Sequence, residues 1–215
     1  ISVAVREGGP DPDYNPSLKS AIEKAKAENM PNDNIQRAIK KGSGEDSGAS
    51  YEKIIYEGYG PEGVAVIVNC LTDNRNRTAA DIRHAFDKFG GNLGQNGSVI
   101  FMFDHKGVLT IDKKDKDEEE FMLEAIDAGA EDVQMEEDLF VVTTSMDDFA
   151  KVRDNLLENG YEFHTADLFY LPQNEIAVED PEAQKKLQKM IDMLEDNDDV
   201  QSVFHNWQNE DSENE

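Results

Sequence analysis

Residues 108–172 read VLTIDKKDKDEEEFMLEAIDAGAEDVQMEEDLFVVTTSMDDFAKVRDNLLENGYEFHTADLFYLP, and this stretch decides the fold. Its hydrophobic periodicity changes repeatedly between that of strands and that of helices. The predicted elements are a strand, a helix, two strands, a helix and a strand, at residues 108–111, 118–128, near 133, 139–144, 147–158 and 161–170. This β-α-β-β-α-β order is that of ferredoxin-like domains.

The segments on either side predict a second α+β unit. Before residue 108, strands are predicted at 51–57, 64–71 and 99–103, a helix with the N-cap Thr78 at 78–89, and a glycine-rich turn at 90–97. After residue 172 there are only a helix at 181–195 and a strand at 200–207. A lone helix and strand cannot form a domain, so we expect them to join the sheet of residues 51–107.

The first fifty residues predict helices. Asn15-Pro16 supplies an N-cap and a preset first turn, and Met30-Pro31 ends this helix. A second helix is predicted from Asn32 or Asp33 to Gly42, followed by SGEDSGAS at 43–50, the composition of a flexible linker.

The predicted fold class is therefore α+β, with a helical N-terminal domain and two ferredoxin-like α+β domains, one inserted in the other. The predicted boundaries are 1–50 for the helical domain with its linker, 51–107 plus 173–207 for the interrupted domain, 108–172 for the insertion and 208–215 for an acidic tail. The chain starts at Ile1 and not at a methionine, so we expect a truncated N-terminus.

The charge is strongly negative but unevenly distributed. The 215 residues include 47 acidic and 21 basic side chains, for a net charge of -26. Residues 1–50 and 51–107 each carry -1, whereas residues 108–172 carry -14 and residues 173–215 carry -10. A protein that coats nucleic acid indiscriminately is excluded, and any surface that faces phosphate is expected before residue 107. The acidic surplus can also serve solubility alone.

Two basic groups are candidate nucleic-acid-binding sites. Arg37, Lys40 and Lys41 share one face of the second helix, where they suit a phosphate backbone or form an ordinary solvated face. Asn74, Arg75, Asn76 and Arg77 precede a helix, where guanidinium groups and helix N–H groups suit an anion. The alternative for the second group is a salt-bridged turn, with Arg75 or Arg77 paired to Asp73 or Asp81. Arg83, in the helix that follows, is a further candidate.

The sequence Gly58-Tyr59-Gly60-Pro61-Glu62-Gly63 fits a dinucleotide fingerprint only in its glycine spacing. That fingerprint needs a helix after the glycines, whereas a strand is predicted here, so we interpret the segment as a hairpin loop. Tyr59 is left as a candidate platform for base stacking.

No catalytic, metal or cofactor motif is found. The four histidines are scattered, and Cys70 falls in a hydrophobic strand as an inert thiol. A single cysteine fits a reducing compartment, and the longest aliphatic run, 64–68, is far too short to span a membrane. We therefore predict a cytoplasmic protein that is not an enzyme, has no cofactor and has no membrane partner.

Several motifs resemble the YebC/PmpR family, which includes a mitochondrial translational activator of cytochrome oxidase subunit I. They cover nearly the whole chain: Asn15-Pro16, 21–26, Asn29-Met30-Pro31, 37–42, 56–61, 71–78, 83–86, 90–94, 190–195 and 198–201. The resemblance implies three parts, a helical domain and two α+β domains, one interrupting the other. Family members usually begin with a basic segment that this sequence lacks, and Glu62 stands where glycine is common.

The resemblance also implies a role in gene expression in the bacterial cytoplasm. The first hypothesis is a DNA-binding transcriptional regulator that uses the two basic groups. The alternative is a ribosome-associated translation factor that binds ribosomal RNA and basic ribosomal proteins and relieves stalling. A remote third hypothesis is a module that senses a small molecule. The oligomeric state is left open.

Overall fold

The computed structural model describes residues 1–27, 29–43, 51–113 and 117–208. Contacts divide the chain into two compact units, one of residues 1–52 with 72–75 and the other of residues 53–71 with 76 onward. Most of the predicted linker, residues 44–50, lies outside the described residues, as does the predicted tail from residue 209.

The described residues of the first unit form the helices α1 (Ser2–Gly8), α2 (Pro16–Ala27) and α3 (Asn32–Gly42). They enclose a small apolar core. The side chain of Asn15 connects two of them: its Oδ1 accepts the N–H of Leu18 at 3.1 Å, and its Nδ2 donates to the carbonyl of Ala4 at 2.6 Å. The predicted N-cap of α2 is therefore confirmed, whereas α1 was not predicted.

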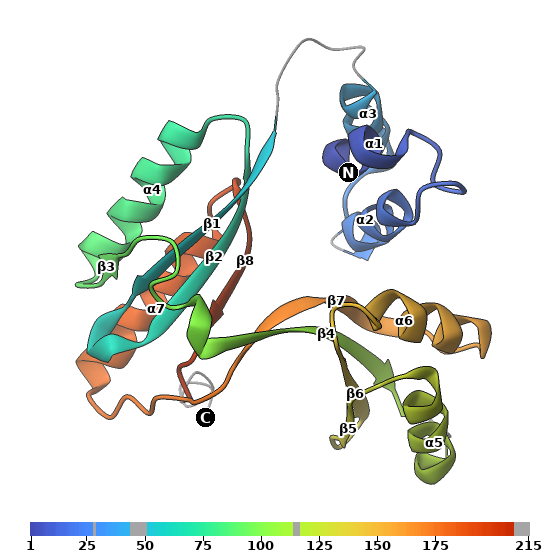
Figure 1. The fold of residues 1–215 in the computed structure, drawn as a ribbon. Coiled ribbons are helices and arrows are strands. Elements are labelled where there is room, and N and C mark those ends of the chain that lie inside the picture. The colour runs from blue at the N-terminus through green and yellow to red at the C-terminus, as the bar shows by residue number, and fades with distance from the viewer. Residues whose placement is uncertain (28, 44–50, 114–116, 209–215) are drawn as a thin grey trace. The chain divides into compact units, whose positions relative to one another are not determined.

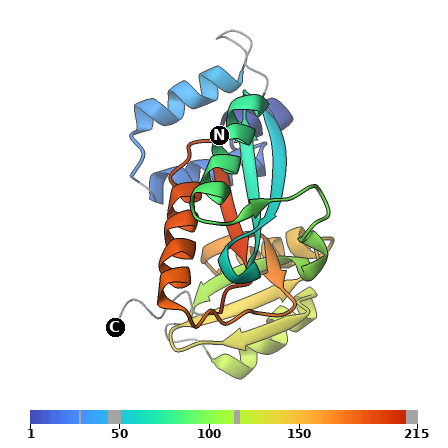
Figure 2. The ribbon, with the colours of Figure 1, turned by 90° about the vertical axis from the view of Figure 1, so that its left-hand side faces the viewer.

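The first sheet of the second unit has the strand order β3-β1-β2-β8. Helices α4 and α7 cover the same face of this sheet, because their apolar side chains share one core with β2 (Figures 1 and 2). The bounds of these elements are Glu52–Tyr59 for β1, Ala65–Thr72 for β2, Arg75–Lys88 for α4, Asn92–Leu93 for β3, Pro181–Glu195 for α7 and Val200–His205 for β8.

The second sheet has the strand order β5-β6-β4-β7, with every neighbouring pair antiparallel. Helices α5 and α6 lie on one face of it (Figure 1). The bounds are Phe103–Asp112 for β4, Glu118–Ala128 for α5, Asp132–Met135 for β5, Leu139–Thr144 for β6, Phe149–Glu158 for α6 and Phe163–Pro172 for β7. The β-α-β-β-α-β order and the α+β class are confirmed.

Strand β8 completes the first sheet although the whole second sheet lies between it and β2 in sequence. The two strands are antiparallel, with Ile67 opposite Phe204. This is the pairing that the predicted insertion requires, and the exact domain boundaries stay a prediction. The first sheet runs β-β-α-β and then α-β, so the ferredoxin-like order belongs to the second sheet alone.

The predicted strand at 99–103 is wrong. Ile100–Met102 form a short 3-10 helix, η2, and β4 begins at Phe103. The physical reason is the carboxylate of Glu57, which accepts the backbone N–H groups of Val99 at 2.9 Å and Ile100 at 2.8 Å, so these groups cannot pair with a strand.

The predicted N-cap at Thr78 is also wrong, because α4 begins at Arg75. Thr78 is buried inside the helix, and its hydroxyl donates to a carboxylate oxygen of Asp199 at 2.7 Å.

The loop between β1 and β2 contains a strained residue. Glu62, within the 3-10 turn η1 (Pro61–Gly63), has φ 55° and ψ 18°, the left-handed region that favours glycine. We expect Glu62→Gly to raise the free energy of unfolding by about 0.5 kcal/mol, since relief of strain exceeds the added entropy of the unfolded chain. Urea denaturation measures this, with Glu62→Ala as the control that removes the carboxylate but keeps the strain. An equal gain in both variants would assign the effect to charge.

Candidate nucleic-acid interface

One exposed face of α3 carries the first predicted group. Arg37, Lys40 and Lys41 are all exposed, and Ile35 is buried on the opposite side of the helix. Arg37 Nη1 lies 3.4 Å from Oδ1 of the exposed Asn34. The spacing i, i+3, i+4 therefore gives the cationic stripe that the sequence predicts.

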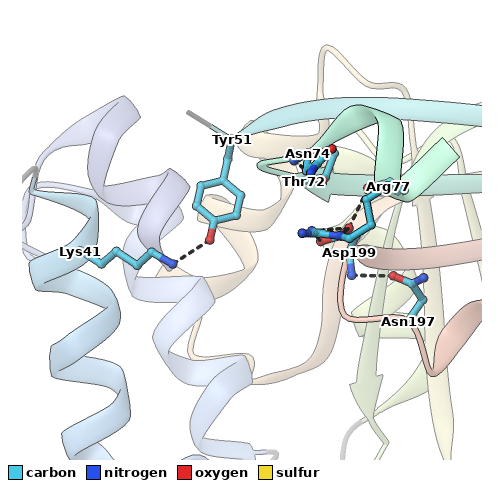
Figure 3. Close-up of polar contacts among 8 residues, drawn as sticks. Lys41, Tyr51, Thr72, Asn74, Arg77, Asn197 and Asp199 are labelled. Atoms are coloured by element: carbon cyan, nitrogen blue, oxygen red, sulfur yellow. Dashed lines mark hydrogen bonds and ion pairs between the residues drawn. The ribbon is translucent and has the colours of Figure 1, made fainter. Parts of the chain in front are cut away.

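A tyrosine that sequence reasoning missed positions the end of this stripe. Lys41 Nζ donates to the hydroxyl of Tyr51 at 2.9 Å and lies 5.3 Å from the centre of its ring (Figure 3). The guanidinium carbon of Arg6 lies 5.7 Å from the same ring. The hydrogen bond to Tyr51 raises the pKa of Lys41, so the ammonium stays charged at neutral pH.

The helices α2 and α3 are locally basic within a very acidic chain. Together they contain six basic side chains, Lys19, Lys24, Lys26, Arg37, Lys40 and Lys41, against two acidic ones, Glu23 and Asp33. The positive surplus of these two helices is the feature that distinguishes them from the acidic sequence after residue 107.

The second predicted group lies at the start of α4. The N–H of Asn74 is accepted by Thr72 Oγ1 at 2.9 Å (Figure 3), and Asn74, Arg75 and Asn76 are exposed. Arg75 Nη1 lies 3.9 Å from the carboxylate of Glu52, with both side chains exposed. An exposed pair at this separation is weak, so it leaves Arg75 able to exchange partners.

Arg77 differs from its neighbours because it holds a nearly buried carboxylate. Its Nη2 lies 2.9 Å and 2.8 Å from the two oxygens of Asp199, and its Nε lies 3.3 Å from one of them (Figure 3). The N–H of Asp199 is bonded to Asn197 Oδ1 at 2.9 Å. The carboxylate that Arg77 binds lies 122 residues later in the chain, a partner that no local pattern indicates.

The two remaining candidates lie in different environments. Arg83 is exposed on α4. Tyr59 is half-buried at the end of β1, where its hydroxyl donates to the carbonyl of Ser98 at 3.1 Å and its ring packs beside an apolar cluster. Tyr59 therefore supports the loop that follows β3, and its stacking on a base stays a prediction.

In the described part of the chain, a metal site, a reactive thiol and a membrane-spanning helix all have little support. No three His, Cys, Asp or Glu side chains gather there as a metal ion would require. Burial, together with the nearby Asp199 carboxylate, raises the pKa of Cys70 to about 12, so its thiol is protonated and unreactive. No helix among these residues has both the length and the apolar character needed to cross a membrane.

Comparison with known proteins gives similarity over nearly the whole chain. Residues 1–45 match the TACO1/YebC protein N-terminal domain, and residues 51–207 match the TACO1/YebC second and third domain. A protein of Finegoldia magna is 66% identical over 210 residues, which cover 98% of this chain and 87% of that protein. A protein of Acetivibrio thermocellus is 54% identical over 98% of this chain and 87% of its own length. Both are named "Probable transcriptional regulatory protein".

A solved structure shows the same architecture. The crystal structure of the conserved hypothetical protein Aq1575 from Aquifex aeolicus superposes with a TM-score of 0.83 at 45% sequence identity. The match covers 96% of this chain and 85% of that one.

Proposed function

Because the chain belongs to the TACO1/YebC family, we propose that it is a nucleic-acid-binding regulator of gene expression that acts on DNA in the bacterial cytoplasm. The role is not enzymatic. The observation that supports it best is the exposed cationic face of α3, in a chain that otherwise has a large acidic surplus.

The residue types on α3 suit duplex DNA. Arg37, Lys40 and Lys41 match phosphate oxygens, and the exposed amides of Asn34 and Gln36 lie among them, where amides can hydrogen-bond to base edges. The major groove of B-form DNA admits an α-helix, whereas that of A-form RNA is too narrow. This geometry favours DNA as the target of the helix.

The start of α4 supplies the second proposed contact. Arg75, Asn76 and Asn74 would bind phosphate there, beside the N–H groups of the first helical turn, and Arg83 would extend the contact along α4. We propose that Arg77 contributes chiefly by fixing the start of α4 through Asp199.

The cationic face of α3 is tested by the double variant Arg37→Gln, Lys40→Gln. We expect its affinity for duplex DNA to fall about tenfold at moderate salt, and the slope of log affinity against log salt to decrease by about 2, because two phosphate contacts are lost. Anisotropy of a labelled duplex across a salt series measures both quantities.

The matched control is Lys185→Gln, Lys186→Gln, which removes two exposed lysines from α7 and changes the net charge by the same amount. An equal loss in this control would mean that only net charge matters, and an unchanged affinity in the α3 variant would exclude this face. The ribosome-associated role stays a prediction. A higher affinity for ribosomal RNA than for duplex DNA in the same titration would favour it.

A further inference from the structure

The segment from Phe89 to Phe103 is unusual for this chain because it contains no charged residue. These fifteen residues (FGGNLGQNGSVIFMF) lie in a sequence in which 32% of residues are charged, and no other uncharged run is as long. Their exposed side chains include the amides of Asn92, Gln95 and Asn96. A surface of this kind in an acidic protein does not repel a polyanion.

The buried carboxylate of Glu57 accepts hydrogen bonds from the backbone of this segment. Glu57 is on β1, and its two oxygens accept the N–H groups of Gly97 at 2.7 Å, Val99 at 2.9 Å and Ile100 at 2.8 Å. These backbone donors lower the pKa of Glu57 although burial by itself raises it. The negative charge of Glu57 is therefore buried and compensated by N–H dipoles.

Further bonds fix the rest of the loop. The carbonyl of Glu57 accepts the N–H of Gly94 at 2.8 Å, and the carbonyl of Gln95 accepts that of Ser98 at 3.0 Å in a tight turn. Gly97 has φ +85° within this turn, a conformation that requires glycine. The hydroxyl of Tyr59 reaches the carbonyl of Ser98 on the same loop. The loop is thus ordered in advance of any contact.

The loop ends by presenting an aromatic ring to solvent. Phe101 is the middle residue of η2 and is 67% exposed, whereas Ile100 and Met102 on either side pack against the apolar cluster. When a flat apolar partner covers a large exposed ring such as this, the free energy falls, because apolar surface is removed from water.

We propose that residues 94–101 form a binding site for an unstacked base of a single-stranded nucleic acid, with the base stacked on Phe101 and its edge bonded to the amides of Gln95 or Asn96. The inference rests on the proposed function, because it assigns a second mode of nucleic-acid contact. Aromatic rings stack on every base, and amides supply both a donor and an acceptor for base edges. Tyr59 is the stacking residue that the sequence predicts, but its hydroxyl is bonded to the loop, whereas the ring of Phe101 is exposed.

The test is Phe101→Trp, because the one native tryptophan, Trp207, is only 5% exposed and gives little background response to a ligand. Titration with oligothymidylate is expected to quench the new fluorescence in step with the rise in anisotropy of a labelled oligothymidylate. Phe101→Ala is expected to weaken oligothymidylate binding about tenfold. Tyr14→Ala, which removes an aromatic ring that is 86% exposed in the helical unit, is expected to leave that affinity unchanged.

Each other outcome overturns the proposal in a distinguishable way. Oligothymidylate that binds without quenching Phe101→Trp, and equally well to Phe101→Ala, excludes the loop and leaves the proposed function standing. Binding to duplex DNA without binding to oligothymidylate also excludes the loop and leaves the proposed function in place. Absence of binding to either nucleic acid excludes both the loop site and the proposed function. Circular dichroism verifies that the variants are folded. If Phe101→Ala does not fold, the fluorescence of Phe101→Trp still reports stacking.

Discussion

Replacing Glu57 by alanine is expected to lower the free energy of unfolding by about 3 kcal/mol or more, the largest effect that we predict for a single side chain. Three backbone N–H groups, those of Gly97, Val99 and Ile100, would lose a charged acceptor in an interior position. Each charge-assisted bond contributes about 1.5–3 kcal/mol, and buried donors left without partners add a further penalty. Urea denaturation at neutral pH measures the loss.

The pH dependence gives this prediction a second readout. Backbone donors place the pKa of Glu57 in the folded state below its ordinary value of 4.5. The carboxylate therefore stabilises the fold fully above pH 4.5 and loses its contribution as pH falls through the lower pKa. The difference in stability between the native protein and Glu57→Gln should be large at neutral pH and shrink in this acid range.

The control is Glu136→Gln, which changes an exposed glutamate in the same way. Its stability relative to the native protein is expected to stay within about 0.5 kcal/mol at neutral pH. A difference for Glu57→Gln that persists unchanged to strongly acidic pH would contradict the assignment of the anionic carboxylate as the acceptor.

Replacing Asp199 by alanine is expected to cost about 3 kcal/mol, the second-largest effect, because a nearly buried carboxylate that accepts charge-assisted and hydroxyl hydrogen bonds is removed. Asp199 is only 8% exposed and accepts bonds from both Arg77 and Thr78. Its loss removes a carboxylate acceptor from the buried Thr78 hydroxyl and from the guanidinium of Arg77 near the start of α4. Urea denaturation again supplies the measurement.

Two further variants show whether the pair or the position matters. Asp198→Ala removes the exposed neighbouring carboxylate and is expected to change stability by less than about 0.5 kcal/mol. The double variant Arg77→Ala, Asp199→Ala is expected to be less unstable than the sum of the single losses predicts, since the two side chains act on each other. Additive losses would show that Arg77 and Asp199 contribute independently.

Elements with strong local signals were predictable from the sequence to the residue. Helix α5 spans Glu118–Ala128 as expected, because the Asp117 side chain accepts the N–H of Glu120 and Gly129 ends the helix with φ 114°. Helix α7 begins at Pro181, and the carboxylate of the preceding Asp180 likewise caps its first turn. Such caps lie within three or four residues of what they control, so one sequence suffices to find them.

The failed predictions have long-range causes. Residues 99–103 contain β-branched and aromatic residues that favour a strand, but Glu57, more than 40 residues earlier, binds the N–H groups of Val99 and Ile100. Thr78 looks like a cap, but its hydroxyl bonds to Asp199. No local pattern carries either interaction.

In the candidate site too, local features could be predicted from the sequence and long-range contacts could not. The cationic face of α3 follows from helical spacing and could be expected from Arg37, Lys40 and Lys41 alone. The supports of the basic groups could not: Tyr51 beneath Lys41 and Asp199 beside Arg77 come from other elements. Phe101 was missed because exposure of an apolar residue on an irregular segment has no periodic signature.

The late position of β8 in the sequence determines the order in which the protein can fold during its synthesis. All four strands of the second sheet lie within residues 103–172, so that sheet can form while the chain is still growing. The first sheet must wait for Val200–His205, and until then one edge of β2 has no partner and the apolar face of α4 lacks α7. An unpaired strand edge beside an apolar surface is prone to aggregation. A chain whose synthesis stops before Val200 would therefore expose both the open edge of β2 and the apolar face of α4.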